Sequence, residues 1–170
     1  LLLPFAKQMV WLVKRIIREK HDPHRVEKKL LYLDDRIAQT PTIALTQTLR
    51  ELARMGRTAA NNLKLAVEAF FERDETKAAK VMENEKTVNY FNHEITNYLV
   101  KFKALQLPEH DNIFYGGLFH VVSDMERISG HAENIAEYAI IMAEGKIKLS
   151  DEGTEELRKM SEKTLQTLDT

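Results

Sequence analysis

The chain lacks cysteine entirely, and it has only six glycines and four prolines among its 170 residues. Without cysteine it can form neither disulfides nor zinc–thiolate sites, so a metal ion would need carboxylate, histidine or amide ligands. With 44% hydrophobic and 30% charged residues, the composition is typical of long amphipathic helices rather than sheets or disordered segments. The expected fold class is therefore all-α.

Neither sign of charge predominates, because 25 basic and 26 acidic residues leave a formal net charge of -1. A chain without an overall positive field has no general attraction for the phosphates of nucleic acid. We therefore expect no nucleic-acid partner. The length is sufficient for one full domain with smaller flanking pieces.

The first 20 residues combine an apolar run with basic residues toward its end. The run from Leu1 to Ile17 is interrupted by polar residues and is too short to cross a bilayer alone, which needs about 20 apolar residues. Arg18 and Lys20 extend a basic flank of the kind found on the cytoplasmic side of membrane helices. We expect residues 1–20 to be the end of a transmembrane helix or an interfacial amphipathic helix. The alternative is a helix docked on its own bundle or on another copy.

After a polar linker over residues 21–42, apolar residues recur at alternating spacings of three and four, which predicts helices. The short connections require neighbouring helices to run antiparallel. Residues 43–145 are therefore predicted to form an antiparallel three-helix bundle. The predicted apolar seams are, in order, Leu45, Leu49, Leu52, Gly56, Ala59, Leu63, Ala66 and Phe70; then Val81, Glu85, Val88, Asn92, Ile95, Leu99 and Phe102; and then Leu118, Val121, Met125, Ile128, Ala132, Ile135, Ala139 and Met142.

The predicted helix ends carry capping residues. Asp74 is a suitable N-cap for the second helix, and Gly145 a suitable C-cap for the third. A fourth helix is predicted to begin near Ser150, within residues 146–170. Because Glu156–Met160 resembles Glu51–Met55, that helix could be the start of a truncated second repeat.

Polar residues accumulate on the third predicted helix and on the facing part of the second. Carboxylates at a helix seam repel one another unless a cation lies between them, so such a group is a candidate metal site. The alternative is a solvated face whose charges pair with each other. The metal candidates are Glu85, Asn89, Glu126 and Glu133, and the polar face for a partner or ion comprises Asp124, Arg127, His131, Asn134 and Glu137.

Catalysis has no support in the sequence. No nucleophile, base and orienting group stand in a known spacing, and there is no glycine-rich phosphate loop. We expect the protein not to be an enzyme, with no catalytic residues.

The segment Asp124–Glu137 resembles the signature helix of PhoU proteins, in which Glu-Arg-Ile-Gly-Asp-His-Ala is followed by Asn-Ile-Ala-Glu. The stretches Tyr32–Arg36 and Thr40–Leu45 resemble the junction between transporter and PhoU-like domain in bacterial sodium-phosphate cotransporters. The resemblance implies three-helix bundles in tandem and multinuclear metal binding by Glu/Asp-x-x-x-Asp patterns. The matching positions are Glu85 with Asn89 and Glu126 with Gly130, so both second carboxylates are lost, although Glu133 could compensate.

By this resemblance the protein is expected to be a cytosolic regulatory or accessory domain of a sodium-dependent phosphate transporter. Its expected partners are the transmembrane portion of the same polypeptide, which would handle phosphate and sodium, and a second copy in a homo-oligomer. No cofactor other than a divalent or trivalent metal ion is expected. The expected location is the bacterial cell membrane, with this region on the cytoplasmic side. Two alternatives are a free-standing PhoU-like regulator of phosphate signalling and a structural helical interaction module without a ligand.

Overall fold

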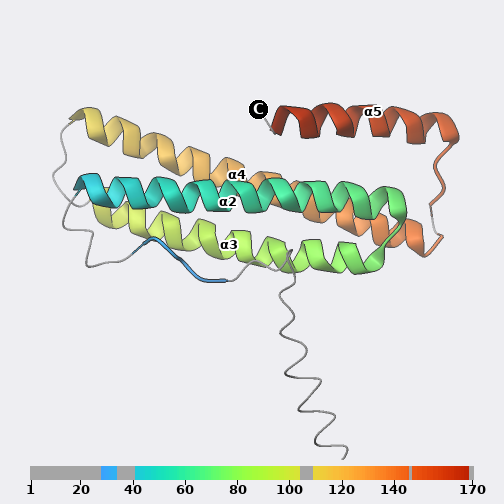
Figure 1. Ribbon diagram of the computed structural model, residues 1–170, viewed down its shortest axis with the longest axis horizontal. Coiled ribbons are helices and arrows are strands. Elements are labelled where there is room, and N and C mark those ends of the chain that lie inside the picture. The colour runs from blue at the N-terminus through green and yellow to red at the C-terminus, as the bar shows by residue number, and fades with distance from the viewer. Residues whose placement is uncertain (1–27, 34–40, 104–108, 146, 169–170) are drawn as a thin grey trace, which may run out of the picture.

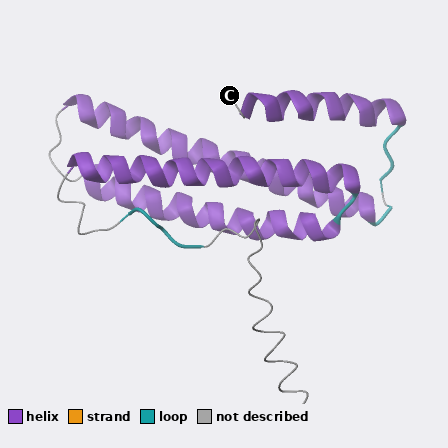
Figure 2. Cartoon of the chain, in the orientation of Figure 1, coloured by secondary structure: helices purple, strands orange, loops and turns teal. Residues whose placement is uncertain are grey.

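The computed structural model describes residues 28–33, 41–103, 109–145 and 147–168. Over these residues the chain forms four helices, α2 (Pro41–Glu72), α3 (Glu75–Lys103), α4 (Glu109–Ala143) and α5 (Asp151–Leu168). Figure 1 shows α2, α3 and α4 packed side by side and antiparallel, with α5 lying along one side of them. Figure 2 shows helices and loops but no strand in this part of the chain. The all-α class and the three-helix bundle are confirmed, whereas the predicted helix over residues 1–20 lies outside the described residues.

The turn between α2 and α3 reverses the chain within a few residues. Arg73 adopts a left-handed backbone conformation with φ of 55°. The Asp74 carboxylate then caps α3 as predicted, since its Oδ1 accepts hydrogen bonds from the amides of Thr76 and Lys77 at 2.8 and 3.0 Å. The Lys77 ammonium bonds back to Glu68 on α2 at 2.8 Å. This tight connection places α2 and α3 antiparallel.

The end of α4 and the start of α5 also follow the sequence signals. Gly145 has a φ of +72°, the left-handed conformation that ends helices and that glycine adopts without steric cost. Ser150 caps α5, because its Oγ accepts the amide of Gly153 at 3.1 Å. Among the described helices α5 comes close in its backbone only to α2, and none of its residues is fully buried.

The interior of the bundle contains two apolar clusters. The first is built around Phe91, Met55 and Ile95 and includes the larger side chains. The second consists mainly of alanines from α2, α3 and α4, which let the helices approach closely. Its completely buried alanines are Ala66, Ala69, Ala78, Ala132, Ala136 and Ala139.

The buried stripe of α4 is displaced from the predicted seam. Val121 is 40% exposed, whereas Val122 and Ala136 are completely buried. On α2, Leu49 of the predicted seam is 41% exposed and Met55 is buried instead. Each helix packs against two neighbours, so its buried stripe is wider than a two-helix seam and is centred between them.

None of the described helices combines the length and the apolar character needed to cross a membrane.

Candidate functional site

The four candidate metal ligands lie on α3 and α4, with Glu85 as the member that the other three act on. Glu85 is only 6% exposed, and the carboxylates of Glu133 and Glu126 act on it electrostatically. Asn89, one turn further along α3, forms a side-chain hydrogen bond with Glu85. We refer to Glu85, Asn89, Glu126 and Glu133 as the acidic cluster.

The acidic cluster alters the protonation of its most buried member. Burial raises the pKa of the Glu85 carboxyl above its ordinary value, and repulsion by Glu133 and Glu126 raises it further. The hydrogen bond from Asn89 and the nearby charge of Lys86 act in the opposite direction, but the net shift is upward. Glu85 is therefore a carboxyl group that resists carrying a charge.

The acidic cluster does not fit the multinuclear metal centre that the PhoU resemblance implies. Within the described part of the chain, no three acidic or histidine side chains converge as a metal ion would require. Asn89 is engaged with Glu85, and Gly130 offers no side-chain donor at all. The cluster is better described as a group of mutually repelling carboxylates at a helix interface.

The polar face of α4 lies open to solvent. Asp124 and Arg127 are each 70% exposed and form a pair at 3.8 Å, which contributes about 0–1 kcal/mol at such exposure. Their neighbours His131, Asn134 and Glu137 are exposed as well. These exposed side chains are available to a partner.

A buried polar contact in the middle of the bundle was missed by the sequence analysis. Asn62 on α2 and Ser129 on α4 are both completely buried. The Asn62 Nδ2 donates to the Val81 carbonyl at 3.1 Å and to the Ser129 Oγ at 3.4 Å. Asn62 is next to Leu63 of the predicted seam but is not part of that seam. A buried stripe wider than the predicted seam would have included it.

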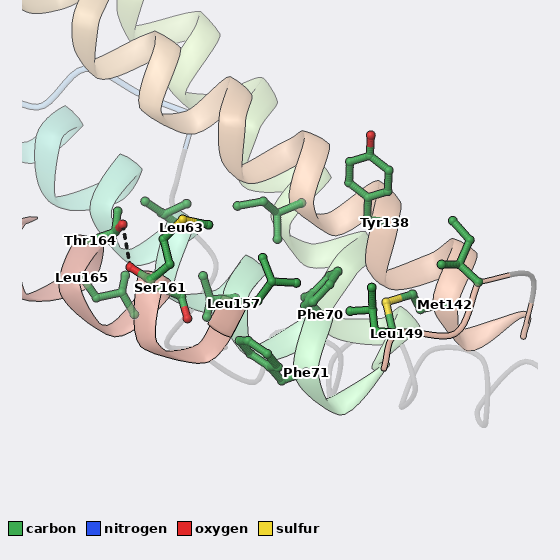
Figure 3. A pocket seen from close by; sticks show the side chains of 14 residues that line it. Leu63, Phe70, Phe71, Tyr138, Met142, Leu149, Leu157, Ser161, Thr164 and Leu165 are labelled. Atoms are coloured by element: carbon green, nitrogen blue, oxygen red, sulfur yellow. Dashed lines mark hydrogen bonds between the residues drawn. The ribbon is translucent and has the colours of Figure 1, made fainter. Parts of the chain in front are cut away.

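An apolar pocket lies between α2, α4 and α5, and it was also missed. Its volume is about 450 Å³, within the range of small-molecule sites. Figure 3 shows Phe70 and Phe71 of α2 and Leu157 and Leu165 of α5 among the side chains around it. The complete lining comprises Leu63, Val67, Phe70, Phe71, Ile135, Tyr138, Met142, Ile147, Leu149, Leu157, Met160, Ser161, Thr164 and Leu165.

Comparison with known proteins establishes the family of this three-helix bundle. The family model described as PhoU domain matches residues 52–139, from within α2 to near the end of α4. The chain therefore belongs to the PhoU domain family.

Two curated relatives carry the same printed name, phosphate-specific transport system accessory protein PhoU homolog. The protein from Aquifex aeolicus is 30% identical over 101 residues, which cover 59% of this chain and 46% of the relative. The protein from Clostridium acetobutylicum is 31% identical over 91 residues, covering 51% and 41% respectively. The chain thus matches slightly less than half the length of these relatives. No solved structure gives a significant match.

The relatives correct the predicted location. Both are named as accessory proteins of a transport system, which contradicts the expectation that this protein belongs to the bacterial cell membrane with this region on the cytoplasmic side. That expectation depended on the apolar and basic pattern of residues 1–20, which lies outside the described structure. The helices of the bundle instead direct their apolar side chains toward one another.

Proposed function

We propose that this protein is a PhoU-type accessory domain that regulates phosphate transport by binding a protein partner. The observation that carries the proposal is the family match from α2 to α4, together with two relatives named as phosphate-specific transport accessory proteins. We further propose that the domain acts without catalysis, because neither the acidic cluster nor the α4 face sets a nucleophile beside a general base.

The exposed polar face of α4 is the proposed contact surface for that partner. It carries both signs of charge, with Arg127 beside Asp124 and Glu137, and its side chains, His131 among them, are exposed. A surface of mixed charge favours orientation and selectivity in binding over raw affinity. The proposed partner is a protein component of a phosphate transport system that presents complementary charges.

A narrower form of the proposal is that the bundle is one domain of a sodium-phosphate cotransporter polypeptide. The resemblance of residues 32–45 to the junction in those proteins supports it, whereas a free-standing regulator agrees equally well with the two relatives. The reading frame upstream of Leu1 distinguishes the two forms. A frame encoding several apolar spans of about 20 residues supports the narrower proposal, and their absence refutes it.

Phosphate uptake by cells tests the broader proposal. Cells whose own gene for this protein is deleted would be complemented with the wild-type gene, with Arg127→Glu, or with Lys159→Glu as a matched control. Arg127 and Lys159 are similarly exposed, at 70% and 67%, but Lys159 lies on α5. We expect the wild type and Lys159→Glu to restore regulated uptake and Arg127→Glu to fail. Unchanged phosphate uptake after the deletion would refute a role in phosphate transport.

A further inference from the structure

Helix α2 carries a buried carboxylate, that of Glu51, which does not belong to the acidic cluster on α3 and α4. Glu51 is completely buried beside the large apolar cluster. Its Oε2 accepts hydrogen bonds from two consecutive backbone amides, those of Leu31 and Tyr32, at 3.0 and 2.9 Å. Its Oε1 pairs with Arg54 at 2.6 Å. A buried carboxylate is stable only when its charge is paired and its lone pairs are satisfied, and here residues far upstream complete that requirement.

Arg54 also binds this upstream segment, through a backbone carbonyl instead of the amides. Its Nη1 donates to the carbonyl oxygen of Lys29 at 2.6 Å, while the guanidinium lies over the Phe91 ring with 4.5 Å to the centroid. Glu51 and Arg54 together thus recognise two amides and one carbonyl of a single short segment. We call residues 28–33 the strap, which is drawn in blue in Figure 1.

The side chains of the strap add apolar contacts to this backbone recognition. Leu30 and Leu33, three residues apart, pack against the large apolar cluster, and the Lys28 ammonium lies 5.4 Å from the centroid of the Tyr90 ring. Leu31, between the two leucines, is 54% exposed. The strap is therefore a bent segment that is bound both through its backbone, by Glu51 and Arg54, and through the apolar side chains of Leu30 and Leu33.

The contacts among α2, α3 and α4 are made by the helices themselves. Helices α2, α3 and α4 contact one another along their lengths, whereas the strap has no regular secondary structure and contacts Glu51 and Arg54 of α2, Tyr90 of α3 and the large apolar cluster. If the strap leaves, water reaches Glu51 and Arg54 and restores their hydration. That rehydration offsets part of the free energy lost with the contacts.

We propose that Glu51, Arg54 and Phe91 form an acceptor site for a short, bent peptide segment, that the strap occupies it in cis, and that the strap detaches while the bundle stays folded. Attachment fixes where the chain upstream of Lys28 leaves the bundle. Detachment uncovers a surface on α2 and α3 with a paired carboxylate and guanidinium. The acceptor site is independent of the α4 face proposed for partner binding.

Amide hydrogen exchange, measured by NMR on the full chain, tests this proposal. In the wild type we expect the amides of Leu31 and Tyr32 to be protected, but to exchange faster than amides near Phe91, because strap opening does not require unfolding. Glu51→Gln places an NH₂ group opposite Arg54 and removes the charge. We expect it to accelerate exchange at Leu31 and Tyr32 by at least about tenfold, with exchange near Phe91 unchanged.

Two further variants keep the test decisive. Glu68→Gln is the matched control, because Glu68 is an exposed acid on the same helix and pairs with Lys77; it should leave strap exchange unchanged. If Glu51→Gln does not fold, Leu30→Ser alters the strap alone and should accelerate the same two amides. The proposal is overturned if neither variant accelerates them, or if Leu31, Tyr32 and the core amides exchange at one common rate in the wild type.

Discussion

Asn62 on α2 donates a hydrogen bond to the hydroxyl of Ser129 on α4 over 3.4 Å, and both side chains are completely excluded from solvent. On α3 and α4 the contact lies beside Val81 and Ala132 of the alanine cluster, and Val88 of the large cluster lies about two helical turns further along α3. A buried polar contact at one level of a bundle disfavours helix registers that would leave its members unpaired. We therefore expect the two bonds donated by Asn62, together with apolar packing, to favour the observed relative heights of α2, α3 and α4.

The first prediction concerns this polar contact. Replacing Asn62 by alanine removes its hydrogen bonds to Val81 and Ser129 and leaves a small cavity, so the free energy of unfolding should fall by about 2–4 kcal/mol. Ser129→Ala removes only a hydroxyl and should cost about 1 kcal/mol. Urea denaturation followed by circular dichroism measures both. Equal stability of Asn62→Ala and the wild type would show that the contact does not support the bundle.

The second prediction concerns pH. Because the pKa of Glu85 is raised in the folded protein, the folded state binds this proton more tightly than the unfolded state does. The contribution of Glu85 to stability is therefore most favourable below its ordinary pKa of about 4.3 and declines as pH rises through the raised folded value. Glu85→Gln should abolish this decline, so the difference in unfolding free energy between variant and wild type should grow from pH 4 to pH 8.

The neighbours of Glu85 supply the control for that experiment. Glu133→Gln removes the larger of the two repulsions from carboxylates, so the decline in stability should become smaller than in the wild type. Parallel pH profiles for the wild type and Glu85→Gln would contradict the assignment of the raised pKa to Glu85.

The third prediction concerns the alanine cluster. Ala136 is completely buried where α4 meets its neighbours, so Ala136→Leu should force the helices apart and cost about 1–3 kcal/mol or more. Ala53→Leu is the matched control, because Ala53 is exposed on α2 and leucine is nearly as good a helix former. Thermal unfolding would measure both variants. A melting temperature of Ala136→Leu equal to that of Ala53→Leu would contradict close packing at this level.

The fourth prediction concerns metal ions. Since the acidic cluster does not present a converging ligand set, added Mn²⁺, Zn²⁺ or Fe³⁺ should leave the melting temperature unchanged, and Glu126→Ala should behave like the wild type in their presence. Differential scanning calorimetry at a series of metal concentrations makes the measurement. A rise with added metal that is lost in Glu126→Ala would restore the metal site implied by the family resemblance.

Local features of the fold could be predicted from the sequence because they depend on neighbouring residues. The helical periodicity, the Asp74 cap, the left-handed Gly145 and the start of α5 at Ser150 all rest on interactions within one or two turns. The segment Asp124–Glu137 likewise identified the family, because that resemblance depends on the order of residues and not on their packing. The apolar run at the N-terminus led to a wrong prediction of location, because such a run can belong to a spanning helix, an interfacial helix or a helix docked on protein.

Only the tertiary structure decided which residues face one another. Periodicity defines a stripe on each helix, but the width and centre of that stripe depend on how many helices surround it, so Val122 is buried and Val121 is not. The raised pKa of Glu85 arises from burial and from Glu133 on another helix. Nothing in the local sequence distinguishes Glu51 from an acid on a helix surface. In the structure it is buried beneath the strap, some twenty residues upstream. Such contacts join residues distant in the chain, and no local pattern encodes them.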